Sequence, residues 1–258
     1  MRLHKTSEKI LTNAMKDVYK YASIKIKEIG GEVIHKKKFS LGNCSRYYQY
    51  AGGEPTYFSH KYFIKPDGGI LFARIKNRDI PILITEDKTQ GTNDIYYHQS
   101  NDKSQYIKQS IGNAFERTAK NKDAAQMIFA GVNYFPYAIF ASGCDFHSSE
   151  TIGSRAVAMN WCQSNHYVDI SDKTTKKHVY NDIENIINNI NIQKRRNGKD
   201  CVASIFIKGH NYINMRHGSS MWEKEEIVKI CNNIVDKVCD EIKKMTTQQY
   251  KYIPPIII

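Results

Sequence analysis

Two acidic residues and one lysine stand at a spacing that suits the hydrolysis of a phosphodiester. Asp67 lies in the run Pro66-Asp67-Gly68-Gly69, and 18 residues separate it from Glu86, which opens the triplet Glu86-Asp87-Lys88 at the end of an apolar segment. Successive side chains of a strand alternate between faces, so Glu86 and Lys88 share one face while Asp87 points to the other. A turn between two strands returns Asp67 beside Glu86. We therefore expect two carboxylates and one ammonium to converge at one margin of a sheet.

This set of groups predicts a magnesium-dependent nuclease. Two carboxylates bind a hard divalent cation, usually Mg²⁺, and Mn²⁺ suits the same oxygen ligands. The lysine can orient or help to deprotonate the attacking water, and it offsets charge in the transition state. Asp87 is a further candidate ligand, through its backbone carbonyl, although its opposite facing favours a structural or solvated side chain. By itself the pattern is weak, because Glu86 and Lys88 could form an ordinary surface pair.

The elements that must position these groups alternate between helix and strand, which predicts an α/β fold with a central mixed sheet flanked by helices. No repeat and no long linker is visible, so we expect a single domain. Hydrophobic periodicity predicts helices at 6–29, 110–129, 179–192 and 222–244. Short apolar runs predict strands at 70–75, 80–88, 137–142 and 202–207, with a polar turn at 76–79 and a loop or irregular strand at 40–62.

The composition favours a cytoplasmic protein that binds nucleic acid. The formal net charge of +12 attracts polyanions, although a chain rich in Lys, Asn and Ile also follows from an AT-rich coding sequence. No apolar run approaches the ~18 residues of a membrane helix, and the N-terminus has no secretory signal. The six cysteines show no zinc-binding spacing and are expected to be small reduced core residues.

Four segments together resemble the EcoRI-type restriction endonucleases. They occur in the order and approximate spacing of that family and read IKPDGGI at 64–70, EDKTQG at 86–91, GNAFER at 112–117 and FPY at 135–137. The resemblance covers about residues 50–245, and the first 50 residues match poorly. It implies a single restriction-endonuclease-like domain over 1–258, with an N-terminal helix and extension at 1–50 and a catalytic and DNA-recognition core at 60–245.

The resemblance also implies roles for individual residues. Asp67, Glu86 and Lys88 correspond to the family's catalytic metal ligands and lysine. The residues that correspond to the family's base-reading segment, around an AATT core, are Asn113, Ala114, Glu116 and Arg117. Asn can bond adenine bidentately and Arg can pair with purine acceptors, which agrees with that role. Arg155 corresponds loosely to a second arginine-bearing segment, and Gln90 and Lys65 are candidate phosphate contacts. The residues before Gly112 depart from the family, so the outer base pair is not predicted.

The function expected from the resemblance is that of a type II site-specific deoxyribonuclease. It would cut both strands of a short palindromic duplex and leave 5′-phosphate ends with 5′ overhangs. A palindromic target implies a homodimer, and a methyltransferase would protect the same site. The alternative is a DNA repair or recombination nuclease that reads structure, which gives no reason for the Asn113–Arg117 cluster. A non-catalytic DNA-binding regulator would have no need of Asp67, Glu86 and Lys88.

Overall fold

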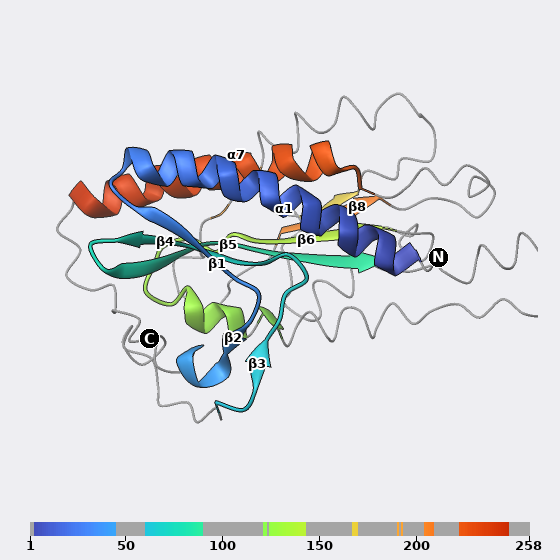
Figure 1. The fold of residues 1–258 in the computed structure, drawn as a ribbon, viewed down its shortest axis with the longest axis horizontal. Helices are drawn as coiled ribbons and strands as arrows, with labels where there is room; N and C mark the ends of the chain where they lie inside the picture. Colours follow the sequence, from blue (N-terminus) through green and yellow to red (C-terminus); the bar gives the residue numbers. More distant parts are fainter. Residues whose placement is uncertain are drawn as a thin grey trace, which may run out of the picture.

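The chain forms a mixed β-sheet with helices on both faces, as the sequence predicted. The computed structural model describes residues 3–44, 60–89, 121–122, 124–142, 167–169, 190, 192, 204–208 and 222–247. Helices α1 (Leu3–Glu28) and α7 (Lys224–Thr247) lie side by side over one face of the sheet (Figure 1). A shorter helical segment within 121–128 lies on the opposite face.

The main sheet has six strands in the order β1-β4-β5-β6-β8-β7. Their bounds are β1 Glu32–Lys36, β4 Gly69–Ile75, β5 Arg78–Thr89, β6 Tyr137–Ser142, β7 Tyr167–Asp169 and β8 Ser204–Lys208. Strands β1, β4 and β5 pair in antiparallel fashion, whereas β6, β8 and β7 continue from β5 in parallel. Strand β5 is thus the boundary between the two halves. A separate two-stranded sheet joins β2 (Phe39–Ser40) to β3 (Phe63–Ile64).

The hairpin between β4 and β5 is tighter than the sequence predicted. Lys76 and Asn77 have φ angles of 49° and 62°, and two consecutive left-handed residues form the type I′ turn that matches the twist of paired strands. Strand β5 therefore begins at Arg78, and the assignment of Asp79 to a polar turn was wrong. The Asp79 side chain is buried, and it accepts a hydrogen bond of 2.7 Å from Arg74 Nε.

Helix α1 ends where the glycine pair predicted. Gly30 has a φ of +78°, its amide donates to the Lys27 carbonyl, and the Gly31 amide donates to the Ile26 carbonyl. These two bonds form a Schellman motif, which needs a left-handed residue and so favours glycine. The apolar face that defined this helix in the sequence is buried, including Leu11 and Val18.

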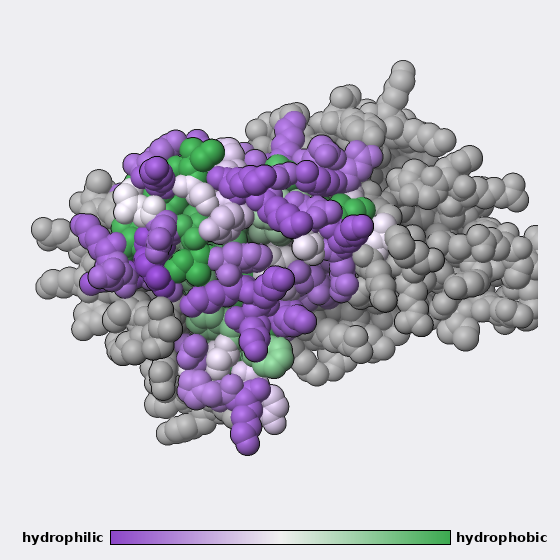
Figure 2. Space-filling view, in the orientation of Figure 1, coloured by the Kyte–Doolittle hydropathy of each residue, from purple (hydrophilic) through white to green (hydrophobic). Residues whose placement is uncertain are grey.

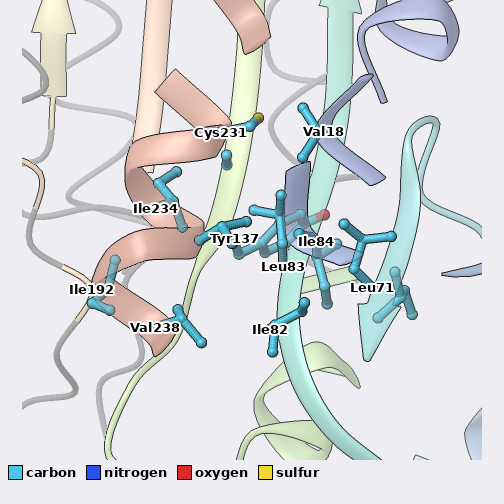
Figure 3. Packing of buried hydrophobic residues seen from close by; sticks show 14 of the residues in the cluster. Val18, Leu71, Ile82, Leu83, Ile84, Tyr137, Ile192, Cys231, Ile234 and Val238 are labelled. Atoms are coloured by element: carbon cyan, nitrogen blue, oxygen red, sulfur yellow. The ribbon is translucent and has the colours of Figure 1, made fainter. Parts of the chain in front are cut away.

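The core lies mainly between the sheet and the layer formed by α1 and α7. Figure 3 shows Val18 of α1 and Ile234 and Val238 of α7 packed with apolar side chains of the central strands. Phe140 of β6 is fully buried, stacks on Phe206 of β8 and meets the ring of Trp222 edge-on. In the view of Figure 2, hydrophilic residues cover most of the described surface.

Other expectations were met only in part. Strand β6 has the predicted bounds, whereas β1 and β7 were not predicted. Ile190 and Ile192 are not helical, so the helix predicted at 179–192 extends too far. Their carbonyl oxygens accept hydrogen bonds from Lys237 Nζ and from the Phe135 amide. Cys44, Cys231 and Cys239 are free and buried, as predicted. Residues 110–120, 179–189 and the apolar tail at 253–258 lie outside the described residues.

Among the described helices, none is both long and apolar enough to span a membrane.

Removal of the Phe140 ring should destabilise the fold strongly. Phe140→Ala is expected to lower the free energy of unfolding by about 3–5 kcal/mol, because the ring is fully buried between two other aromatic rings. Urea unfolding followed by circular dichroism measures the loss. Ile24→Ala is the control, since Ile24 is 62% exposed and should change stability by less than about 0.5 kcal/mol. Equal effects of the two substitutions would contradict this description of the core.

Candidate active site

The loop at residues 66–69 attaches directly to the end of strand β5. The Gly68 amide donates to the Thr85 carbonyl at 3.1 Å, and the Gly69 amide donates to the Pro66 carbonyl at 2.9 Å. A Cβ atom on Gly68 would overlap the Thr85 hydroxyl, so the close approach of the two segments requires glycine there. Gly69 has a φ of +80°, which also favours glycine. The Pro-Asp-Gly-Gly run thereby places Asp67 beside the Glu86–Lys88 segment.

The structure brings the three predicted catalytic side chains together. Lys88 Nζ lies 2.6 Å from Glu86 Oε1 and 3.4 Å from Asp67 Oδ2. The Asp87 amide also donates to Asp67 Oδ2, at 3.1 Å. Both carboxylates therefore converge on one ammonium group at the end of β5.

Glu86 is buried and accepts hydrogen bonds from two uncharged residues in addition to Lys88. Its side chain is only 4% exposed. The Tyr137 hydroxyl donates to Oε2, and Asn121 Nδ2 donates to Oε1 at 3.1 Å. Tyr137 opens β6, which pairs in parallel with β5, and Asn121 belongs to the helical segment on that face of the sheet. Burial and the neighbouring Glu86 charge raise the pKa of Tyr137 well above its ordinary value, so its hydroxyl remains a donor.

Asp87 points to the other face of the sheet, toward helix α1. Its Oδ2 accepts hydrogen bonds from Ser7 Oγ at 2.6 Å and from Thr89 Oγ1 at 3.2 Å. Burial raises the pKa of Asp87 to about 6, although the bond from Ser7 acts in the opposite direction. The Asp87 carbonyl, the atom considered as a metal ligand, accepts a hydrogen bond of 2.9 Å from Lys88 Nζ. The side chain of Asp87 therefore connects β5 to α1 and does not join the carboxylate pair.

The charges around Lys88 favour its protonated form. Burial alone lowers the pKa of this ammonium, but the charges of Glu86 and Asp67 and their hydrogen bonds outweigh burial and raise the pKa above its ordinary value. Two carboxylates and one ammonium carry a formal net charge of −1. The site can therefore accommodate further positive charge.

The donor atoms of the site fit a hard divalent cation. Among the described residues, both hydrogen bonds of the Asp67 carboxylate go to Oδ2, which leaves Oδ1 as an available ligand. Mg²⁺ takes oxygen ligands and commonly binds through one or two carboxylates, completed by water and substrate phosphate. The described residues include no cluster of three or more metal-binding side chains, so a cation here would rely on such outside ligands.

A hollow of about 340 Å³ opens beside Asp67. Lys37 of the β1–β2 connection and Lys65 of the loop after β3 line it, together with Glu8 and Thr12 of α1. Lys65 thus shares this hollow with Asp67, and its contact with phosphate stays a prediction. The other candidate DNA contacts are Gln90, Asn113, Ala114, Glu116, Arg117 and Arg155, and all of them lie outside the described residues.

Sequence reasoning missed Tyr137, Asn121 and Ser7. Tyr137 was noted as the first residue of the strand predicted at 137–142 and as part of the FPY segment, but not as a contact of Glu86. Its position at the start of a strand parallel to β5 could have indicated proximity to Glu86, but the strand order is not visible in the sequence. Asn121 and Ser7 carry no local signal, because polar residues on helices are ordinarily solvated.

Strand β5, at the boundary of the mixed sheet, thus ends beside the two carboxylates and the lysine that the sequence predicted for a nuclease. The family model for restriction endonuclease EcoRI matches residues 20–249, and the chain belongs to this family. It is therefore a type II restriction endonuclease, a hydrolase of DNA phosphodiester bonds, and members of this family generally use divalent metal ions. The match begins within α1, further toward the N-terminus than the resemblance at 50–245 indicated. No curated protein matches the chain significantly.

A methyl group at position 68 should displace Asp67 and impair cleavage. In Gly68→Ala the added Cβ overlaps the Thr85 hydroxyl, and relief of the overlap moves the loop away from β5. A misplacement of about 1 Å can lower a rate about 100-fold, and a cleavage assay under single-turnover conditions measures the loss.

Gly30→Ala is the matched control for this substitution. Gly30, unlike Gly68, has a positive φ, and nothing lies within 4 Å of its Cβ position. It should cost about 1 kcal/mol of stability and leave the cleavage rate unchanged. A Gly68→Ala enzyme that cleaves at the wild-type rate would show that the contact with Thr85 does not position Asp67.

Proposed function

We propose that the protein is a Mg²⁺-dependent endonuclease that cuts both strands of a short palindromic DNA site with an AATT core. The products are 5′-phosphate ends with four-base 5′ overhangs and 3′-hydroxyl groups, and Mn²⁺ substitutes for Mg²⁺. The observation that supports this proposal best is the convergence of Asp67, Glu86 and Lys88 within 3.4 Å at the end of β5.

Each residue of the site has a separate task in the reaction. Asp67 and Glu86 hold the cation, and Asp87 contributes at most its backbone carbonyl. A bound Mg²⁺ supplies a Lewis acid and lowers the pKa of coordinated water. Lys88 orients the attacking water and offsets negative charge on the phosphate oxygens. Water adds to phosphorus as the bond to the 3′ oxygen breaks, which gives the 5′-phosphate and the 3′-hydroxyl.

The formal charges support this assignment. The triad carries −1, a divalent cation adds +2 and the bound phosphodiester adds −1, so the assembled site is neutral. A low-dielectric environment strengthens each of these attractions, and Glu86 is buried. A site with a second lysine in place of a carboxylate would not hold the cation.

Specific binding is assigned to residues on either side of the catalytic loop. Asn113, Ala114, Glu116 and Arg117 read the AATT core in the major groove, and Arg155 contacts a base or a phosphate. Lys65 and Gln90 contact phosphates, and Lys37 joins them because it lines the same hollow as Lys65. The net charge of +12 supports attraction to the DNA backbone.

The palindromic target implies a homodimer, because two-fold symmetric half-sites are matched by symmetric subunits. Residues 1–258 act as one endonuclease domain, in which 60–245 hold the catalytic and recognition core. The enzyme works in the cytoplasm, where a cognate methyltransferase protects the same sites without forming a stable complex with it.

Removal of the Asp67 carboxylate or of the Lys88 ammonium should abolish DNA cleavage but leave specific DNA binding intact. Asp67→Ala and Lys88→Ala are each expected to lower the Mg²⁺-dependent cleavage rate by roughly 1,000-fold or more. Specific binding, measured with Ca²⁺ by gel shift, should persist because the base-reading residues are intact. Lys243→Ala on α7 is the control for loss of a lysine, since that side chain is 55% exposed. Normal cleavage by either site variant would remove the triad from the mechanism.

The ends produced on DNA should identify a sequence-specific enzyme. Digestion of plasmid DNA is expected to give discrete bands, and sequencing of ends cut from a random-sequence library should reveal AATT at the centre of every site. Asn113→Ala and Arg117→Ala should weaken binding to that site by about 1–3 kcal/mol each. Smears on plasmid DNA, with cleavage confined to branched or mismatched duplexes, would instead support a repair or recombination nuclease with the same catalytic core.

A further inference from the structure

The Glu86 carboxylate is surrounded by donors of two different kinds. Lys88 brings a full positive charge to Oε1, whereas Tyr137 and Asn121 bring uncharged donors to Oε2 and Oε1. A carboxylate offers about four lone-pair positions, and these three donors use three of them. The described contacts therefore fix the carboxylate in one orientation and leave one position on Oε2.

Uncharged donors suit a carboxylate that must bind a cation. A second lysine or an arginine at either position would bring the formal charge of the site to zero and weaken its attraction for Mg²⁺. A tyrosine hydroxyl and an amide restrict the rotation of the carboxylate but leave the net charge of −1 in place. The two uncharged donors thus orient Glu86 without neutralising its negative charge.

The Tyr137 side chain is held firmly enough to orient another group. It is 1% exposed, and its ring packs edge-on against Phe135 at a centroid distance of 6.0 Å. The parallel pairing of Ile84 with Tyr137 and of Glu86 with Ile139 puts Tyr137 and Glu86 on the same face of the sheet. The sheet itself therefore aims the hydroxyl at Oε2.

Asn121 approaches Glu86 from outside the sheet. It lies in the helical segment that covers this face, four positions after Arg117 in the sequence. Its bond to Oε1 is 3.1 Å long and shares that oxygen with Lys88. The two uncharged donors thus reach opposite oxygens from two independent elements.

We propose that Tyr137 and Asn121 are positioning residues that hold the Glu86 carboxylate in the orientation required to bind the divalent cation. The inference rests on the proposed function, because it assigns Glu86 to metal binding. Tyr137 acts through Glu86 and has no direct contact with the substrate in this assignment.

The test compares two buried tyrosines that lie three residues apart. Tyr137→Phe removes only the hydroxyl that reaches Glu86. Tyr134→Phe is the matched control, since Tyr134 is fully buried and its ring packs against Phe129. Isothermal titration of Ca²⁺ into the complex of each enzyme with cognate DNA measures metal affinity without turnover. Single-turnover cleavage at saturating Mg²⁺ and thermal unfolding without metal complete the set.

The expected result is a loss confined to metal binding and cleavage. Tyr137→Phe should weaken Ca²⁺ binding about tenfold, which is the loss of one hydrogen bond to a charged group, and should slow cleavage by a similar factor. The affinity for DNA without metal should stay at the wild-type value, and Tyr134→Phe should leave Ca²⁺ binding unchanged. Unaltered Ca²⁺ affinity in Tyr137→Phe, or an equal loss in Tyr134→Phe, would overturn the inference.

Asn121→Ala keeps the inference testable if Tyr137→Phe does not fold. Asn121 is only partly buried, so its truncation should leave the melting temperature near that of the wild type and weaken Ca²⁺ binding severalfold. Unchanged Ca²⁺ affinity in this variant would also contradict the inference. Failure of the wild-type enzyme to cleave DNA with Mg²⁺ would instead refute the proposed function.

Discussion

The backbone hydrogen bond between Gly68 and Thr85 determines where the candidate active site forms. It joins the loop that carries Asp67 to the strand that carries Glu86 and Lys88. The two bonded residues are 17 positions apart in the sequence. The bond continues the antiparallel ladder of β4 and β5, in which Gly69 pairs with Thr85. The two-residue turn at Lys76–Asn77, together with a bulge opposite Leu71 and Phe72, sets the register of this hairpin near the site. A slip of one residue would turn Glu86 and Lys88 to the face covered by α1.

Side chains on both faces of strand β5 make contacts at the candidate active site. Glu86 and Lys88 point toward the helical segment at 121–128, where Asn121 meets Glu86. Asp87 points the other way and bonds to Ser7 of α1, while its amide bonds to Asp67. The N-terminal helix therefore contacts the residue that separates the two proposed catalytic side chains. The family match begins only at residue 20, so the first turns of α1 lie outside it. The contact with Asp87 nevertheless joins α1 to the same core as the site.

The sequence predicted the three acidic and basic residues of the candidate active site, but not the residues that hold them in place. Alternation along a strand was enough to place Glu86 and Lys88 on one face and Asp87 on the other, because this rule depends only on backbone geometry. The end of α1 followed from Gly30 for the same reason. Asp79 was misassigned because a charged residue in a short polar run looks like a turn, and only the fold reveals its buried pairing with Arg74. Tyr137 and Asn121 could not be predicted, since their contact with Glu86 depends on the strand order and on helix packing.

The three donors to Glu86 differ in their freedom to move, which bears on how the site accepts a cation. Tyr137 is fixed by the sheet and by the ring of Phe135. Lys88 carries its charge on a flexible four-carbon stem, and its side chain is 17% exposed. It also bonds to Asp67 and to the Asp87 carbonyl, so it occupies the space between the two carboxylates. In the proposed function Asp67 and Glu86 would hold a cation, while Tyr137 would keep the Glu86 carboxylate in its orientation. Lys88 would lie beside that cation and could donate to a water molecule or a phosphate oxygen.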